Sequence, residues 1–375
     1  MVAWAAMAQL KPFRALRYDA GAVGVLDRVV SPPHDVIDEA TRERLLAASP
    51  YNAVRLVRPD DVAEAARLLA EWRSEGILRR DERPAAWILE EAFSGRDGVP
   101  RTRRGIVARV RLEPYERGVV LPHERTFSRS KSRRLPLLRA TRTKLSPVLF
   151  LHEGSGPEPA GSPLVEAELD GVTSRLWRVD DPTEAGRLLA LVRGRLLIAD
   201  GHHRYETALR FHQEDGSEET AYVLGVLVSR ADPGLVILPT HRLAAAAPAE
   251  LNGSLHPTSV AGTAEALDRL AHVPRDRAAF VLLRPDGVQL VESEEAALDT
   301  AVVDSLPLEG VRYTASAAEA ERAVASGGAG AAFLVRPPTM EQVADLAAAG
   351  ERMPPKSTYF FPKLTSGLLF SPLDE

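Results

Sequence analysis

The residues best suited to chemistry follow a short apolar run near the middle of the chain. Leu196–Ala199 is typical of a buried strand, and the segment after it has the apolar spacing of an amphipathic helix. Five consecutive residues join the two: Asp200, Gly201, His202, His203 and Arg204. A helix that starts at such a turn directs main-chain N–H groups and the positive end of its dipole toward an anion. The histidines and the arginine add donors, so we expect a phosphate-binding site here.

A second group of ionisable residues lies between residues 121 and 153. His123, Glu124 and Arg125 follow a proline turn, Lys131 comes shortly after, and a strand is expected at Val148–Leu151. Two structural alternatives stay open for these charges. The segment could be a solvated basic face, and Glu124 could pair with a neighbouring arginine in an ion network.

Lysine is rare in a chain that otherwise uses arginine as its basic residue. The lysines are Lys11, Lys131, Lys144, Lys356 and Lys363. A lysine that persists against this bias indicates a need for a compact, mobile point charge. Chance survival explains the pattern equally well, so the pattern only supports other evidence.

Composition restricts the class of protein. The 375 residues carry a net charge of −5, which gives no overall basic field for nucleic acid. The absence of cysteine excludes disulfides, a thiol nucleophile and a Cys-based zinc site, and it favours a cytoplasmic location. No apolar run approaches the roughly 18 residues that a membrane span requires.

The order of the elements predicts a mixed α/β fold. Strands are expected at 86–93 and 104–113 as a hairpin, a helix at 61–78, and a helix capped by Asp38. Asn52–Pro59 alternates in polarity and predicts a strand. We expect three parts: a core at residues 10–245, a smaller α/β unit at 246–350, and a tail at 351–375 that returns to the core.

Several longer motifs carry a resemblance to a known family. In chain order they are SPPHDVI, NAVRLVRP, LPHERT, KLSPVLFLHE, ADGHHRYETAL, LPTHRL and STYFFPKLTSGLLF. Together they resemble the DUF1015 family over nearly the whole chain. The DGHHR element is similar to the signature of the ParB/sulfiredoxin-like fold, a group that includes free-serine kinases. Two departures stand out: His34 replaces an aromatic phenol, and Ser128–Ser130 replaces a Gly-Pro-like turn.

The resemblance implies transfer of a phosphoryl group to free L-serine, giving O-phospho-L-serine, with pyrophosphate or with ADP or ATP as donor. This reaction needs charge neutralisation and in-line positioning. Glu124, His203 and Asp200 are the expected catalytic residues, with Glu124 as general base. Asp200 is also the expected ligand of a magnesium ion. The expected phosphate-binding residues are Gly201, His202, His203, Arg204, Arg125, Lys131 and Lys363.

The amino-acid side of the site is expected at Asp35, His123, Thr240 and His241. Two of them have a structural alternative, since Asp35 could cap a helix and His241 could be a packed residue at a strand end. The expected partners are serine and the phosphate donor, without nucleic acid or membrane, in a possible homo-oligomer.

Two other classes of function stay open. A metal-dependent hydrolase could use His202 and Glu206, which lie one helical turn apart, with His203 or His123. A ParB-like nucleotide-binding switch without kinase activity is the non-enzymatic alternative. The sequence has no GxxxxGK[ST], HExxH or GxSxG motif.

Overall fold

The computed structural model describes residues 7–125, 131–248, 251, 253–295 and 297–374, and the side chains of residues 131–133 lie outside this description. The chain divides into two units. The first unit consists of Met1–Pro122, Thr126–Val236 and Pro362–Glu375, and the second of His123–Arg125 and Ile237–Phe361. The chain therefore leaves the first unit after Val236 and re-enters it at Pro362.

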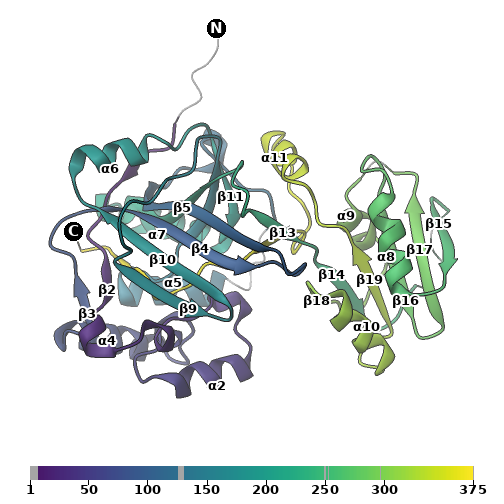
Figure 1. Ribbon diagram of the computed structural model, residues 1–375, viewed down its shortest axis with the longest axis horizontal. Coiled ribbons are helices and arrows are strands. Elements are labelled where there is room, and N and C mark those ends of the chain that lie inside the picture. Colours follow the sequence, from purple (N-terminus) through teal and green to yellow (C-terminus); the bar gives the residue numbers. More distant parts are fainter. Residues whose placement is uncertain (1–6, 126–130, 249–250, 252, 296, 375) are drawn as a thin grey trace, which may run out of the picture. The chain divides into compact units, whose positions relative to one another are not determined.

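A large mixed sheet forms the centre of the first unit (Figure 1). In spatial order its strands are β6 (Val120–Leu121), β11 (Leu196–Asp200), β8 (Val148–His152), β12 (Tyr222–Ser229), β5 (Pro100–Arg111), β4 (Ala86–Ser94), β10 (Val172–Val179) and β9 (Val165–Leu169), with β1 (Leu10–Lys11) beside β5. β6 runs parallel to β11 and β8 parallel to β12, whereas the other pairs are antiparallel. Every residue of β12 is buried, as expected for a strand that is covered on both faces.

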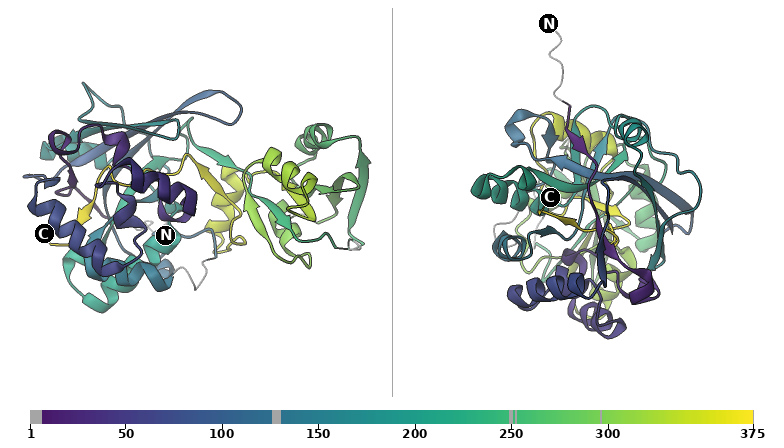
Figure 2. Two further views of the ribbon diagram at one scale, coloured as in Figure 1. Left: turned by 90° about the horizontal axis from the view of Figure 1, so that it is seen from below. Right: turned by 90° about the vertical axis from the view of Figure 1, so that its left-hand side faces the viewer.

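Helices and short strands surround this sheet. The helices are α1 (Ala20–Val23), α2 (Glu39–Ala48), α3 (Val54–Val57), α4 (Val62–Ser74), α5 (Lys131–Thr141), α6 (Pro182–Leu189) and α7 (His202–Asp215). Two strand pairs lie apart from the sheet: β2 (Leu16–Tyr18) with β3 (Leu78–Arg80), and β7 (Thr143–Lys144) with β21 (Ser371–Pro372). Figures 1 and 2 show α2 and α4 grouped together, away from α6. Helix α7 packs against the sheet, because Tyr205 and Ala208 share an apolar cluster with Phe150 and Ile198.

The sequence predicted several of these elements for the right physical reason. Asp38 accepts the N–H of Thr41 at 2.8 Å and caps α2, as expected. The predicted hairpin is confirmed by β4 and β5, although β5 begins at Pro100. The predicted helix at 61–78 is α4, which ends at Ser74 before Gly76, a glycine with a φ of +75°.

The predicted strand at Asn52–Pro59 is wrong. The segment contains the short helix α3, in which Val54, Leu56 and Val57 are all buried. The side-chain oxygen of Asn52 accepts the N–H of Val54 at 2.9 Å, and its amide donates to the carbonyl of Val30 at 3.0 Å. Asn52 thus starts a helical turn at a buried position. Where every apolar side chain is buried, alternating polarity does not distinguish the repeat of a helix from that of a strand.

The second unit is built on an antiparallel sheet. In spatial order its strands are β15 (Leu255–Val260), β17 (Gly287–Ser293), β16 (Ala279–Arg284), β19 (Ala331–Val335), β14 (His241–Ala244) and β18 (Arg312–Thr314). Its helices are α8 (Thr263–His272), α9 (Asp299–Asp304), α10 (Ala317–Ala325) and α11 (Met340–Ala348). A separate pair joins β13 (Val236–Leu238) and β20 (Tyr359–Phe361). Two apolar clusters fill the core of this unit, one around Val281 and Leu283 and the other around Phe280 and Phe333.

The prediction of a mixed α/β chain is confirmed by these sheets and helices. The unit limits differ from the expected domain limits at their edges, since β14 pairs with β18 and β19 of the second unit. Residues 351–361 also belong to the second unit. From Pro362 onward the chain is part of the first unit, where Phe370 bridges Leu16. No helix in the described part of the chain is long and apolar enough to cross a membrane.

Candidate functional site

The turn between β11 and α7 is held in one conformation. Gly201 has a φ of +99°, a backbone conformation that favours glycine, and a Cβ on it would lie 3.0 Å from Arg204 Cζ. Because Gly201 is the N-cap residue of α7, it brings no side chain to cap the first turn. Further along α7, the Tyr205 hydroxyl donates to the Glu113 carbonyl at 2.7 Å and accepts the Glu113 N–H at 2.8 Å. The start of α7 is thus fixed to the body of the first unit.

Asp200 lies at the carboxyl end of β11 between two cations. Lys363 Nζ donates to Oδ1 at 2.5 Å, and the Arg204 guanidinium contacts Oδ2. Arg204 also donates to the Pro147 carbonyl. Burial raises the pKa of Asp200, but Lys363 and Arg204 outweigh it, and with a further contribution from His202 the pKa is lowered. Asp200 is therefore ionised and holds both cations in place.

A second carboxylate and a third cation adjoin this pair. Asp35, in a 3-10 helix at His34–Val36, lies 3.9 Å from the Arg134 guanidinium of α5. Burial and Asp200 raise the pKa of Asp35, whereas Arg204, Lys363 and Arg134 lower it, and the net shift is downward. Asp35 therefore interacts electrostatically with Asp200, Arg204, Lys363 and Arg134, all in the first unit.

We refer to Arg134, Arg204, Lys363, Asp35 and Asp200 as the cation cluster. It contains three positive and two negative groups, so it carries an excess positive charge beside the first turn of α7. Arg134 makes no hydrogen bond within the described part of the chain, and only about a fifth of its side chain is exposed (18%). An arginine side chain that is mostly buried and makes no hydrogen bond within the described residues indicates a place for an incoming anion.

The two histidines lie in the first turn of α7. His202 is buried and His203 is partly buried. The structure therefore brings together seven of the predicted residues, all in the first unit: Asp35, Asp200, Gly201, His202, His203, Arg204 and Lys363. The side chain of Lys131, at the start of α5, lies outside the described residues.

The predicted general base is in the second unit. Glu124 forms a parallel bridge with Met353, and its Oε1 accepts the N–H of Lys356 at 3.0 Å. The Arg125 N–H donates to the Met353 carbonyl at 3.3 Å. Residues 123–125 are thus paired with the segment that precedes β20, and Glu124 is oriented by a main-chain donor.

Three other predicted residues are also in the second unit, and the side chains of two of them are hydrogen-bonded within it. The buried His123 ring contacts Thr358 Oγ1 through Nε2 at 2.9 Å. His241 Nδ1 accepts the N–H of Val335 at 3.2 Å, which places this side chain in the hydrogen bonding of the sheet. Thr240 is buried beside it. The substrate roles of these residues remain predictions.

Metal ligands are not grouped in the described residues. Within them, no set of three or more His, Cys, Asp or Glu side chains is placed to hold a metal ion. Both oxygens of Asp200 contact cations, so a metal at Asp200 would have to displace Lys363 or Arg204. The three-ligand site of the alternative hydrolase is therefore not formed by the described residues.

Comparison with known protein families identifies the family to which this chain belongs. The profile described as "Protein of unknown function (DUF1015)" matches residues 10–309. The chain belongs to the DUF1015 family. The resemblance seen in the motifs is thereby confirmed, and no curated protein sequence matches this DUF1015 chain.

Solved structures similar to the DUF1015 chain are remote in sequence. A free serine kinase in complex with AMP is 17% identical, with a TM-score of 0.40, covering 65% of this chain and 84% of its own. A conserved hypothetical protein from Pyrococcus furiosus is 16% identical, with a TM-score of 0.39, covering 66% and 89%. SbnI with a C-terminal truncation, from Staphylococcus aureus, is 12% identical, with a TM-score of 0.40, covering 71% and 87%.

Sequence reasoning missed two polar residues of the DUF1015 chain. Arg134 lies in a run of basic residues and nothing local distinguishes it from its neighbours. Lys144 was noted for the rarity of lysine but received no role, although it is buried in the first unit. The rarity of lysine was thus a signal that could have found it.

Proposed function

We propose that this DUF1015 chain is a phosphotransferase that moves a phosphoryl group to the hydroxyl of free L-serine and forms O-phospho-L-serine. The observation that carries the proposal is the cation cluster at the start of α7, with its excess positive charge and an Arg134 that has no hydrogen bond to the described residues. Phosphoryl transfer depends mainly on positioning and on stabilising charge that spreads over the phosphoryl oxygens. Serine as acceptor rests on the motif resemblance.

The residues of the first unit hold the donor in this proposal. The main-chain N–H groups at the start of α7, together with His202 and His203, bind the donor phosphates. Arg204 and Arg134 stabilise the leaving phosphate, and Lys363 adds a mobile point charge. Asp200 is a positioning residue, because its ionised carboxylate fixes Arg204 and Lys363 before the donor arrives.

Glu124 is proposed as the general base. Its carboxylate takes the proton of the serine hydroxyl as the bond between serine Oγ and phosphorus forms. The bond between phosphorus and the leaving-group oxygen breaks, and the electron pair leaves with phosphate when the donor is pyrophosphate, or with AMP or ADP when it is a nucleotide. Glu124 Oε1 accepts the N–H of Lys356 within the second unit.

Magnesium is proposed as a companion of the donor. Mg²⁺ sites commonly use one or two carboxylates together with substrate phosphates and water, which agrees with the lack of a three-ligand group in the described residues. Asp35 fits this use better than Asp200, because about a third of its side chain is exposed (31%) and the nearest Arg134 nitrogen is 3.9 Å from its Oδ1. Bound Mg²⁺ would neutralise charge on the donor phosphates.

The decisive experiment is a donor-by-acceptor screen. The purified chain is incubated with serine and each of pyrophosphate, ADP and ATP, with and without Mg²⁺, and O-phosphoserine is measured. We expect product with at least one donor, dependent on Mg²⁺. Binding of a nucleotide without product would support the ParB-like switch, and no product with any donor would refute the kinase.

Two variants test the assigned roles. His203→Ala and Glu124→Gln should abolish phosphoserine formation and leave the thermal midpoint almost unchanged. Arg210→Met, on an exposed turn of α7, is the matched control and should keep full activity. A matched fall of activity and thermal midpoint in either test variant would instead indicate a structural role.

A further inference from the structure

A cavity of about 250 Å³ lies in the first unit beside α5 and α7. Half of its lining residues are apolar, among them Val57, Leu137, Leu138, Leu145, Ala208 and Val223. Since an apolar cavity of about 150 Å³ accommodates benzene, this one has room for a ligand of roughly ten non-hydrogen atoms. Serine and pyrophosphate are polar throughout and would leave these apolar residues uncovered.

Two polar side chains on the wall are buried without a hydrogen bond. Lys144 Nζ and Thr207 Oγ1 have no partner in the described part of the chain, and the two residues are only 5% and 6% exposed. A buried ammonium without an acceptor is costly. The Phe211 ring, with its centroid 5.9 Å from Nζ, compensates for little of that cost.

The charges around Lys144 are mostly positive. Arg109 on β5 lies close enough to depress its pKa, Arg142 faces the same Phe211 ring, and His34, Arg134 and Arg204 also line the cavity with Asp60. Asp60 is exposed and contacts Arg42, so it does not neutralise Lys144. Burial is the largest cause of the lowered pKa of Lys144, about 7, and Arg109 adds to it. A ligand here gains most from an anionic end that faces Lys144 and an apolar body along the wall.

We propose that this cavity binds a small organic acid with an apolar chain, whose carboxylate pairs with Lys144 Nζ and accepts the hydroxyl hydrogen of Thr207. The ligand's carboxylate supplies the acceptor that Lys144 Nζ and Thr207 Oγ1 lack, and its apolar chain covers the apolar part of the wall. This site adjoins that of the proposed reaction, because Arg134 and Arg204 line the cavity and also belong to the cation cluster.

The test is calorimetric titration with hexanoate, hexanol and hexylamine at pH 8. Hexanoate should bind at least roughly 10-fold more tightly than hexanol, because a charge-assisted hydrogen bond forms, and hexylamine should not bind. Binding should take up a proton, since the carboxylate charges Lys144, and the heat should therefore differ between buffers of different ionisation enthalpy. Equal binding of hexanoate and hexanol, or no saturable heat with hexanoate, would overturn the proposal.

Variants test whether Lys144 causes the preference for hexanoate and the proton uptake. Lys144→Met should remove both the preference for hexanoate and the proton uptake, and Lys11→Met is the control that should change neither. Wild-type-like binding by Lys144→Met would contradict the assignment. If this variant does not fold, the pH dependence of the wild type decides: hexanoate affinity must fall as the pH rises above 8. Neither result depends on kinase activity, so failure here and failure of the proposed function can be told apart.

Discussion

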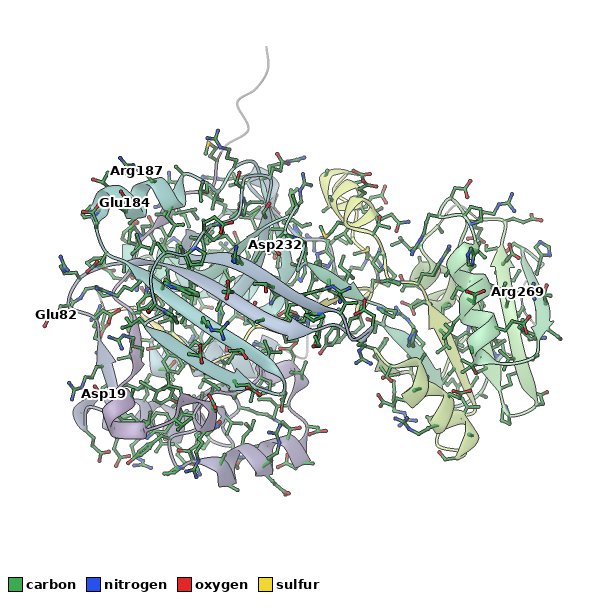
Figure 3. The ribbon with its side chains drawn as sticks, viewed as in Figure 1. Asp19, Glu82, Glu184, Arg187, Asp232 and Arg269 are labelled. Carbon is green, nitrogen blue, oxygen red and sulfur yellow. The ribbon has the colours of Figure 1, made fainter. Side chains whose placement is uncertain are left out.

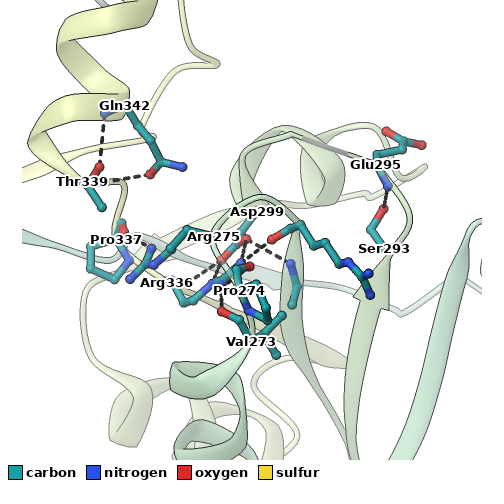
Figure 4. A network of polar contacts seen from close by, with 12 residues as sticks. Val273, Pro274, Arg275, Ser293, Glu295, Asp299, Arg336, Pro337, Thr339 and Gln342 are labelled. Atoms are coloured by element: carbon teal, nitrogen blue, oxygen red, sulfur yellow. Dashed lines mark hydrogen bonds and ion pairs between the residues drawn. The ribbon is translucent and has the colours of Figure 1, made fainter.

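Two buried ionic groups, one in each unit, use arginine in opposite ways. In the second unit Arg336 is closed in by acceptors: it donates to Asp299 at 2.8 and 2.7 Å and to the carbonyls of Val273 and Arg277, each at 2.7 Å (Figure 4). Asp299 in turn accepts the N–H of Ala279 at 3.0 Å. Arg336 forms a two-point ion pair with Asp299, and the nearby Arg275 donates to the Pro337 carbonyl at 2.8 Å. The donors of this network thus end on groups of the protein itself.

The cation cluster of the first unit is not closed in this way. Its three cations share two carboxylates, and among the described residues the contact of Arg134 with an acceptor is the 3.9 Å approach to Asp35. A closed ion pair stabilises one conformation, whereas a cluster with excess charge and a guanidinium without a hydrogen bond is prepared for an anion. The comparison therefore predicts large stability effects in the second unit and large activity effects in the first.

The largest loss of stability is expected when the ion pair between Arg336 and Asp299 is broken. Asp299→Ala leaves the Arg336 charge buried without its carboxylate, so the free energy of unfolding should fall by about 3–5 kcal/mol. Chemical denaturation monitored by circular dichroism measures it. A loss below about 1 kcal/mol would mean that the network in Figure 4 is not a closed structural pair.

A large effect on catalysis is expected in the first unit, with a smaller loss of stability because Lys363 still pairs with Asp200. Arg204→Met should lower phosphoserine formation by about 10²–10³, since one preorganised donor to the transferring group is lost. The rate and the thermal midpoint are both measured, with Arg210→Met on the same helix as control. Equal activity of the two variants would remove Arg204 from the phosphate site.

A pH-dependent effect is expected at Lys144. The pKa of this group is about 7 in the folded chain and near 10.5 when unfolded, so between these values the unfolded chain binds the extra proton. Stability should rise with pH across that window. Lys144→Met should be more stable than the wild type at pH 7, and the difference should shrink toward pH 10. Urea unfolding at several pH values measures it, and parallel curves would contradict the burial of a charge.

The smallest effect is expected at the surface. Arg187 and Glu184 form an exposed ion pair of 2.5 Å one turn apart on α6 (Figure 3). Arg187→Ala should change the free energy of unfolding by less than about 0.5 kcal/mol, because solvent screens such pairs. A larger loss in denaturant unfolding would show that ion pairing alone, without burial, stabilises this chain.

Local sequence was informative wherever the interaction was local. The run from Asp200 to Arg204 is contiguous, so the strand, the turn and the helix start could be predicted together. The contact between Asp35 and Arg134 joins residues distant in sequence, and no spacing rule predicts it. The strand predicted from Asn52 onward was wrong because tertiary packing buries every apolar side chain of α3. The polarity pattern of this segment therefore does not show the helical period. Lys363 was among the expected phosphate-binding residues, with the rarity of lysine as support, and it contacts Asp200.

The pairing of Asp200 with Lys363 spans 163 residues, and this has a consequence for synthesis. At about 5–20 residues per second, a ribosome needs about 8–33 seconds to add the lysine after the aspartate. During that time the nascent first unit has Arg204 but not Lys363 beside Asp200, while the residues of the second unit emerge and can begin to fold. The anion site thus gains its third cation only after both units have been translated almost completely.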